Sequence, residues 1–185
     1  MKKNRKGFTL IELLVVIAII GLLSTLAIVS LNTARQKSRD TKRMADIRTL
    51  QSAIELCINE AGSPPAVPAA PTWAGILGYS CGTSTIQTFL SSSTMPVPPQ
   101  STCVNPAAAI ATGDCYMYCK DSTAGSNKYL LAANDIEAQS TISGDIDSNF
   151  TYSAANCVNS AGAVTAALLG AYCADGSPSV FCLGQ

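Results

Sequence analysis

The sequence predicts an α+β protein with one long N-terminal helix, a small antiparallel β-sheet and a set of stabilising disulfides. Three observations indicate this class. An unbroken apolar run from Phe8 to Leu31 opens a helical pattern that continues to about residue 61. Two strand-like segments separated by a turn follow between residues 115 and 133. Eight cysteines, all on the C-terminal side of the apolar run, favour a disulfide-stabilised domain.

The apolar run is typical of a membrane-spanning helix. It contains 24 residues, of which only Glu12 is charged, and as a helix it spans a hydrocarbon core of roughly 30 Å. The apolar region of a secretory signal peptide is shorter, at about 7 to 15 residues, and a small-residue cleavage site follows it. Here the small residue, Gly7, precedes the run. A cut after Gly7 would remove the basic head, residues 1–7, and leave the helix on the product.

The residues around this cut site carry a family resemblance. A small residue, an aromatic residue and a lone acid stand at Gly7, Phe8 and Glu12, within the stretch KGFTLIELLVVIAIIGLL of residues 6–23. This stretch closely resembles the N-terminus of type IV pilins and pseudopilins. The resemblance implies that a prepilin peptidase/methyltransferase removes the leader and that the new α-amino group of Phe8 is methylated. It also implies that this amine meets the Glu12 carboxylate of a neighbouring subunit.

Glu12 is the costly residue of the segment. A charged carboxylate at the centre of a bilayer costs about 2.5 to 3.5 kcal/mol on insertion scales, so we expect it to have a partner when the helix is buried. In a stack of helices, the amine of Phe8 would neutralise Glu12 and set the stagger between subunits, as one buried polar residue fixes register in a coiled coil. The alternative is that Glu12 protonates in the membrane, and both states can occur at different stages.

The helix is predicted to continue beyond the membrane as an amphipathic helix over residues 32–62. Apolar residues recur there at three- and four-residue spacings, namely Met44, Ile47, Leu50, Ile54 and Ile58. Charged residues, Asp40 and Arg43 among them, are expected to fill the polar positions. Gly62 and the Pro-Pro pair after it predict that the helix ends near Ala61. In the pilin family the corresponding helix packs under a small antiparallel sheet.

The membrane segment departs from the family at one position. Many pilins carry a proline where Val29 stands in this chain. The apolar run has no proline, and Gly21 is its only helix-weakening residue. We therefore expect any unwinding of the helix during assembly at Gly21 and the residues that follow it.

The region after the helix is expected to begin with a connector. Residues 63–114 form this variable segment, which starts with a stretch rich in Pro, Ser and Thr. Its apolar residues are candidate anchors onto the core of the globular head, which comprises residues 32–185. These anchors are Trp73, Ile76, Leu77, Ile86, Phe89 and Leu90.

Residues 115–185 are expected to supply the sheet and most of the cysteines. The segments 115–119 and 128–133 predict a hairpin with a turn at residues 124–127. One or two further strands are expected from three candidate segments, namely residues 150–152, 171–173 and 180–183. For residues 161–169, a run poor in turn formers, a short helix is the alternative to a strand.

The eight cysteines indicate disulfides in an oxidising compartment, because they are even in number and scattered through a small domain. They are Cys57, Cys81, Cys103, Cys115, Cys119, Cys157, Cys173 and Cys182. Eight cysteines allow 105 complete pairings, and proximity alone suggests Cys57 with Cys81 and Cys173 with Cys182. Metal binding is disfavoured because the chain has no histidine and no Cys-x-x-Cys. The cysteine-bearing domain is therefore expected outside the cytoplasm.

An enzyme is not expected from this sequence. There is no histidine for a triad, no phosphate-cradling glycine loop and no metal-ligand cluster, so we predict no catalytic residue and no cofactor. One stretch, with Asp145, Asp147 and Asn149, matches the first half of a calcium loop. Phe150 and Asn156 stand where such a loop needs glycine and glutamate, which favours an ordinary acidic turn.

These features predict a structural subunit of a type IV pilus-like filament that serves adhesion, motility or surface attachment. The expected partners are further copies of the chain in a helical homopolymer, the prepilin peptidase/methyltransferase, and a membrane assembly platform with its motor ATPase. The precursor is expected in the cytoplasmic membrane as a single-pass protein with its C-terminal domain outside. The product is expected in an extracellular pilus or a periplasmic pseudopilus.

Two alternative functions stay open. The chain could be a pseudopilin of a type II secretion or competence (DNA uptake) system, or a low-abundance tip subunit that binds a ligand. Direct nucleic-acid binding is disfavoured on charge. Basic residues collect between Arg35 and Arg48, whereas from residue 49 onward only Lys120 and Lys128 oppose nine acidic residues, which would repel phosphate.

Overall fold

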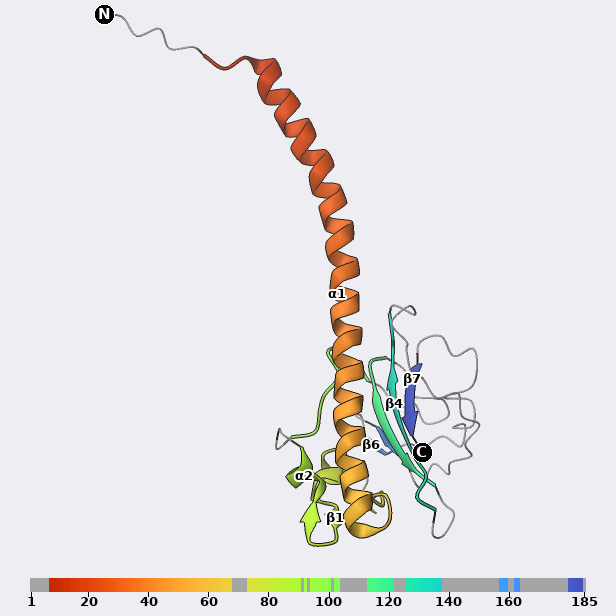
Figure 1. Ribbon diagram of the computed structural model, residues 1–185. Coiled ribbons are helices and arrows are strands. Elements are labelled where there is room, and N and C mark those ends of the chain that lie inside the picture. The colour runs from red at the N-terminus through yellow and green to blue at the C-terminus, as the bar shows by residue number, and fades with distance from the viewer. Residues whose placement is uncertain are drawn as a thin grey trace, which may run out of the picture. The chain divides into compact units, whose positions relative to one another are not determined.

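The structure is a computed structural model that describes residues 7–67, 73–90, 92, 94–100, 102–103, 113–121, 126–137, 157–159, 162–163 and 180–184. The chain divides into two compact units, Met1–Ser38 and Arg39–Gln185. Helix α1 (Leu10–Ala61) gives its first part to one unit and its second part to the other (Figure 1).

The first unit is an apolar helix without a covering layer of its own. All described residues from Gly7 to Ser38 are exposed. An 18-residue window of α1 has a mean hydropathy of 2.8, and none of it is buried. By length and composition, α1 can therefore cross a membrane. An exposed apolar surface of this size needs lipid or other chains around it.

The two ends of α1 follow local rules. The helix begins at Leu10, two residues later than predicted, because Thr9 takes the N-cap position. The predicted end at Ala61 is confirmed. Gly62 follows with a φ of 73°, and its N–H donates to the Ile58 carbonyl at 2.7 Å, which satisfies one of the last open carbonyls of the helix.

The main element of the second unit is an antiparallel sheet with the strand order β6-β5-β3-β4-β7 (Figure 1). Its strands are β3 (Tyr116–Lys120), β4 (Tyr129–Asn134), β5 (Cys157–Asn159), β6 (Gly162–Ala163) and β7 (Val180–Gly184). β3 and β4 form the predicted hairpin, with Tyr118 opposite Leu131. β7, one of the three further candidates, pairs with β4. The other two, residues 150–152 and 171–173, lie outside the described residues. The predicted α+β class is confirmed.

The short helix considered for residues 161–169 is wrong for the two of them that the structure describes. Gly162 and Ala163 form β6, where they pair with Asn159 and Val158 of β5. A neighbouring strand supplies backbone hydrogen-bond partners, and these decide between helix and strand in so short a run. Residues 164–169 lie outside the described part of the chain.

The connector contains four short elements. They are η1 (Ala74–Gly78), β1 (Ser80–Cys81), β2 (Ser84–Thr85) and α2 (Ile86–Phe89). The six predicted anchors all take part in the core. Four of them are buried in it, and the two others, Leu77 and Phe89, pack against it while partly exposed.

The core lies where the second part of α1 meets the sheet and the connector. Its apolar members on α1 are Ile47, Leu50 and Ile54, and those on the sheet include Tyr116, Leu131 and Phe181. Both faces of β3 and β4 are buried. This burial explains why their sequences are apolar almost throughout instead of alternating.

Two tyrosines tie the sheet to α1 through their hydroxyls. Tyr116 donates to Asp46 Oδ2 at 2.7 Å, and Tyr129 donates to Glu55 Oε1 at 3.2 Å. Burial and the neighbouring carboxylates raise the pKa of both phenols above the usual range. Both tyrosines therefore stay neutral and act as donors at physiological pH.

The expectation that Asp40 and Arg43 lie on the polar face of α1 is wrong, because both are fully buried. Arg43 donates through Nε to Asp114 Oδ1 at 2.8 Å and through Nη1 to Asp40 Oδ1 at 2.6 Å. Arg39 adds two hydrogen bonds to the Glu137 carboxylate. Buried charges are tolerated when they are paired and hydrogen-bonded. Here Asp40 comes from α1 itself, and segments after β2 supply Asp114 and Glu137.

The protonation of this cluster follows from its geometry. Burial opposes the charge of Arg43, but Asp114 and Asp40 more than offset it, so the pKa of the guanidinium is raised. The hydrogen bond from Arg39 lowers the pKa of Glu137. The contribution of Glu137 to stability is therefore fully present above the ordinary carboxyl pKa and is lost as the pH falls through the lowered folded-state value.

Three disulfides link the described residues. They join Cys57 to Cys81, Cys103 to Cys115 and Cys119 to Cys157. The first is the pairing that proximity suggested. It ties β1 to α1, and the third ties β3 to its neighbour β5. Cys182 is also disulfide-bonded, but Cys173, the partner suggested for it, lies outside the described residues.

Gly113 is a position where an alanine should destabilise the protein. Its φ is 82°, and an added Cβ would lie 2.4 Å from the Thr102 carbonyl oxygen, which is backbone and cannot move aside cheaply. We expect Gly113→Ala to lower the free energy of unfolding by about 2 kcal/mol or more. Urea unfolding of the full chain in detergent measures it. Gly78→Ala, where a Cβ meets nothing within 4 Å, is the matched control and should change little.

Candidate functional site

The candidate site lies at the beginning of the first unit. Gly7, Phe8 and Thr9 precede α1 and are exposed, with 82% of the Phe8 surface accessible. An exposed segment that precedes a helix is accessible to a protease without unfolding of the chain. The bond between Gly7 and Phe8 lies in this segment.

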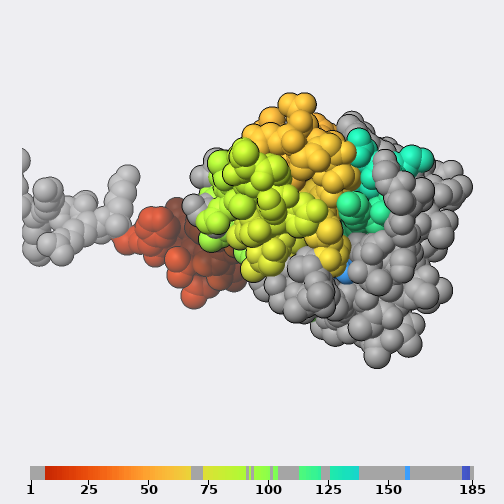
Figure 2. Space-filling model, turned by 90° about the horizontal axis from the view of Figure 1, so that it is seen from below, coloured from red at the N-terminus to blue at the C-terminus, as the bar shows by residue number. Residues whose placement is uncertain are grey.

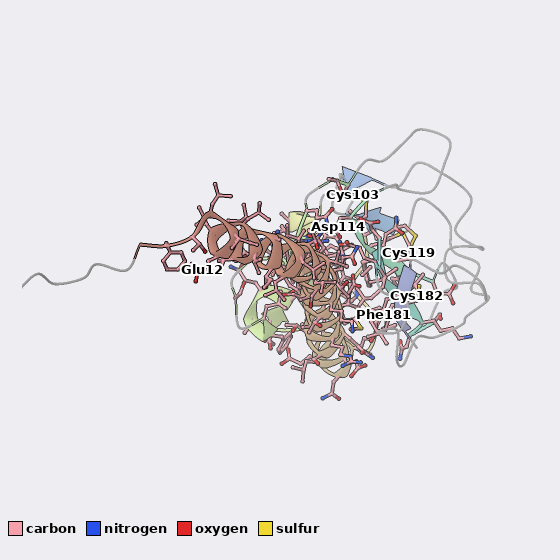
Figure 3. The ribbon with its side chains drawn as sticks, turned by 90° about the horizontal axis from the view of Figure 1, so that it is seen from above. Glu12, Cys103, Asp114, Cys119, Phe181 and Cys182 are labelled. Atoms are coloured by element: carbon pink, nitrogen blue, oxygen red, sulfur yellow. A yellow bond between two sulfur atoms is a disulfide. The ribbon has the colours of Figure 1, made fainter. Side chains whose placement is uncertain are left out.

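Thr9 and Glu12 form a reciprocal cap at the start of α1. The Thr9 N–H donates to Glu12 Oε2 at 2.8 Å, and the Thr9 hydroxyl donates to the same oxygen at 2.6 Å. In return, the Glu12 N–H reaches Thr9 Oγ1 at 3.4 Å. This capping box satisfies otherwise open donors of the helix terminus. Figure 3 labels Glu12 at this end of α1.

The carboxylate therefore has partners inside its own chain. Two donors from Thr9 hold one oxygen, Oε2, and fix the direction of the side chain. The described residues give no hydrogen bond to the other oxygen. An acid placed at the N-terminal end of a helix also faces the positive end of the helix dipole. Glu12 is thus held ready to accept a further donor or a cation without giving up its cap.

A shallow groove lies beside this carboxylate. Its volume is about 390 Å³, and Phe8, Ile11, Glu12, Val15 and Val16 line it. Apart from Glu12, the lining is apolar. The combination suits a group that presents a positive charge next to an apolar body, as an N-terminal amine on an aromatic residue does.

No contact within the described chain explains the glycines at 7 and 21. A Cβ added at either one meets nothing within 4 Å. Helix α1 is continuous through Gly21. The Ser24 hydroxyl donates to the Ile20 carbonyl at 2.7 Å, and the Thr25 hydroxyl donates to the Leu22 carbonyl at 2.8 Å. Any requirement for glycine at these positions must come from contacts with another molecule, for example during processing or assembly.

The role of Thr9 as the N-cap of α1 was not predicted from the sequence. The signal was present, because Thr-x-x-Glu directly before an apolar run is the capping-box pattern. The calcium candidate with Asp145, Asp147 and Asn149 falls outside the described residues. Within the residues that the structure does describe, no group of three or more His, Cys, Asp or Glu side chains could hold a metal ion.

The N-terminal part of the chain is similar in sequence to known proteins. Residues 2–28 match the family model described as the prokaryotic N-terminal methylation motif. The chain is 42% identical over 58 residues to the type IV major fimbrial protein FimA of Dichelobacter nodosus, which covers 31% of this chain and 37% of that protein. It is 40% identical over 58 residues to a fimbrial protein of Pseudomonas aeruginosa, covering 31% and 38% respectively.

A fimbrial protein of Dichelobacter nodosus is 40% identical over 80 residues, which is 42% of this chain and 48% of that protein. The chain thus spans less than half the length of these curated relatives. No solved structure matches the chain. The N-terminal part of the chain is thus similar to the methylation motif and to type IV fimbrial proteins.

Proposed function

We propose that this chain, which its N-terminal motif and relatives support as a type IV pilin, is a structural subunit of a pilus-like filament and not an enzyme. It is processed after Gly7 and assembled through α1. The observation that carries the proposal is the exposed apolar helix with a capped carboxylate, Glu12, at its start. Such a helix is stable in lipid as a monomer and among like helices as a polymer.

The chemistry of assembly follows from the cut. Cleavage after Gly7 turns the Phe8 nitrogen into a primary amine, which is a cation at neutral pH and a substrate for N-methylation. In the precursor this nitrogen is a neutral amide. Only the processed chain can therefore place the Phe8 nitrogen, as a cation, near the Glu12 carboxylate of another copy. Processing would in this way prevent premature assembly.

While the subunit is in the membrane, Thr9 would stabilise the carboxylate of Glu12. Before assembly, its two donors partly compensate the charge of Glu12 inside the chain. In the filament, the methylated amine of a neighbouring Phe8 would add to these donors and make the pair neutral overall. A neutral, hydrogen-bonded pair costs much less in an apolar core than a lone carboxylate does.

Assembly of this chain would depend on other proteins. The chain has no nucleotide-binding loop in its sequence, so energy for moving the helix out of the membrane must come from an assembly platform with a motor ATPase. The C-terminal unit, with its disulfides, would lie on the oxidising side. Mass spectrometry of sheared filaments tests the whole proposal, since it predicts a chain that begins at methylated Phe8. A chain that begins at Met1 in filaments would contradict it.

Gly7 should be required for processing and not for folding. We expect Gly7→Leu to accumulate as precursor, because a peptidase pocket shaped for glycine cannot accept a branched side chain, whereas the chain itself has open space there. Gly7→Ala, the smallest change, is the matched control and should be processed to a larger extent. Gel mobility of the membrane fraction measures both. Full conversion of Gly7→Leu to the mature size would rule out this assignment.

A further inference from the structure

The second part of α1 presents an outward face that the globular unit leaves uncovered. The centre of this face is a strip of exposed, mostly small residues, which are Thr41, Ala45, Thr49, Ser52 and Leu56. Figure 2 shows the end of this helix, in orange, exposed between the connector in yellow-green and the sheet in teal. Opposite positions of the same helix form the core.

Charge is distributed unevenly along this face. Lys42 and Arg48 are exposed toward its N-terminal end, and Glu55 and Glu60 are exposed toward its C-terminal end. Lys42 and Glu60 lie 18 residues apart, or five turns, so they share one side of the strip. Arg48 and Glu55 lie seven residues apart and share the other side. Each side thus carries a basic group followed by an acidic group.

Local stability does not account for Glu60. The last turn of α1 contains no basic residue, although the C-terminal end of a helix favours cations and disfavours acids. In the described part of the chain, the Glu60 carboxylate accepts no hydrogen bond and forms no salt bridge. Glu55 differs, since Tyr129 and Gln51 donate to its Oε1. Glu60 is therefore an exposed acid to which the described residues give neither a hydrogen bond nor a salt bridge.

We propose that this face of α1 is a contact between copies of the chain, in which Arg48 of one copy meets Glu60 of the next. The inference rests on the proposed function and adds to it a contact outside the membrane. The two residues are 12 positions apart, so parallel copies must be displaced by about 18 Å along the helix axis. Lys42 and Glu55 lie 13 positions apart. A contact between Lys42 of one copy and Glu55 of another would need nearly the same displacement, but it would join the Glu60 side of the first copy to the Arg48 side of the second.

This contact does not close on itself. One copy uses the Arg48 side of its strip and the next uses the Glu60 side, so each copy keeps one side free for a further copy. Heterologous contacts of this kind generate open filaments instead of closed dimers. The centre of the face suits a close approach, because Thr49 and Ser52 already bond to the Ala45 and Arg48 carbonyls at 2.9 and 3.0 Å.

The test is a charge exchange in the full chain. Arg48→Glu and Glu60→Lys alone each place like charges opposite one another, and each should remove filaments from the sheared fraction. The double variant restores opposite charges with exchanged positions and should recover filaments. Glu60→Lys also improves the helix terminus, so its melting temperature in detergent should equal or exceed that of the wild type. The control is Lys128→Glu, which reverses the charge of an exposed residue directly before β4. This variant should assemble normally.

The outcomes separate this contact from the proposed function. Normal filaments from both single variants would overturn the contact. This conclusion would also hold if Arg48→Glu weakened the binding of the chain to vesicles with anionic headgroups, because Arg48 would then contact lipid and not another copy. Loss in both single variants without recovery in the double variant would overturn the pairing of Arg48 with Glu60. If the wild-type chain itself is not processed after Gly7 and forms no filaments, the proposed function fails, and the contact fails with it.

Discussion

Glu12→Ala should abolish filaments while leaving cleavage after Gly7 largely intact. The variant removes the only acidic group of the apolar helix, so the amine of a neighbouring Phe8 would be buried without a counter-charge. Removing one partner of a buried ion pair costs about 3 to 5 kcal/mol, which weakens each contact more than a hundredfold. The amount of subunit in the sheared fraction, relative to processed subunit in the membrane, measures the effect. Wild-type filament yield from Glu12→Ala would refute the assembly role.

Glu12→Gln separates charge from capping. Glutamine can replace glutamate as the acceptor for the Thr9 N–H and hydroxyl, so the start of α1 should stay intact. It carries no charge, and we expect filaments to be lost as in Glu12→Ala. If Glu12→Gln assembles normally, the protonated form of Glu12 is sufficient and the ion pair is not the reason for its presence. Thr9→Val tests the cap alone and should reduce yield less than either change at Glu12.

Arg43→Met should destabilise the globular unit by about 3 to 5 kcal/mol. The side chain is fully buried, and so are the carboxylates of Asp40 and Asp114 that it contacts at 2.6 and 2.8 Å. Methionine fills a similar volume but leaves both carboxylates buried without a cation. Chemical unfolding of the full chain in detergent, with disulfides intact, measures the loss. A change below about 1 kcal/mol would mean that water or relaxation compensates these charges.

Two further variants make the Arg43 result interpretable. Arg48→Met changes an exposed arginine of the same helix and should shift stability by no more than about 0.5 kcal/mol. Adding Asp40→Asn and Asp114→Asn to Arg43→Met removes the uncompensated charges and should recover part of the loss. If it recovers nothing, packing around the guanidinium, and not its charge, is what stabilises this region.

Sequence reasoning was reliable where a structure depends on neighbours in the chain. The end of α1 at Ala61 needed only Gly62 and its φ of 73°. The hairpin of β3 and β4 needed two apolar segments and a short turn. The anchors in the connector were recognisable because large apolar residues in an otherwise polar stretch are usually buried in the core.

The same reasoning failed where partners are remote. Asp40 and Arg43 were assigned to the polar face because charged residues at these positions of an amphipathic helix usually face water. Their burial depends on Asp114, which is 71 positions from Arg43, and on Glu137, which is 94 positions away. The pairings Cys103–Cys115 and Cys119–Cys157 likewise depend on how the strands align, since β3 brings Cys119 opposite Cys157.

The sequence by itself determined the membrane-length helix, the predicted cleavage site after Gly7 and the position of the carboxylate of Glu12 five residues beyond it. These features are local, because hydrophobicity, helix periodicity and a capping pattern act within a few turns of the chain. Only the tertiary structure decided which charges are buried, which cysteines pair and which face of α1 stays exposed. These features depend on segments 12 to 98 positions apart coming together, and no local pattern encodes such contacts.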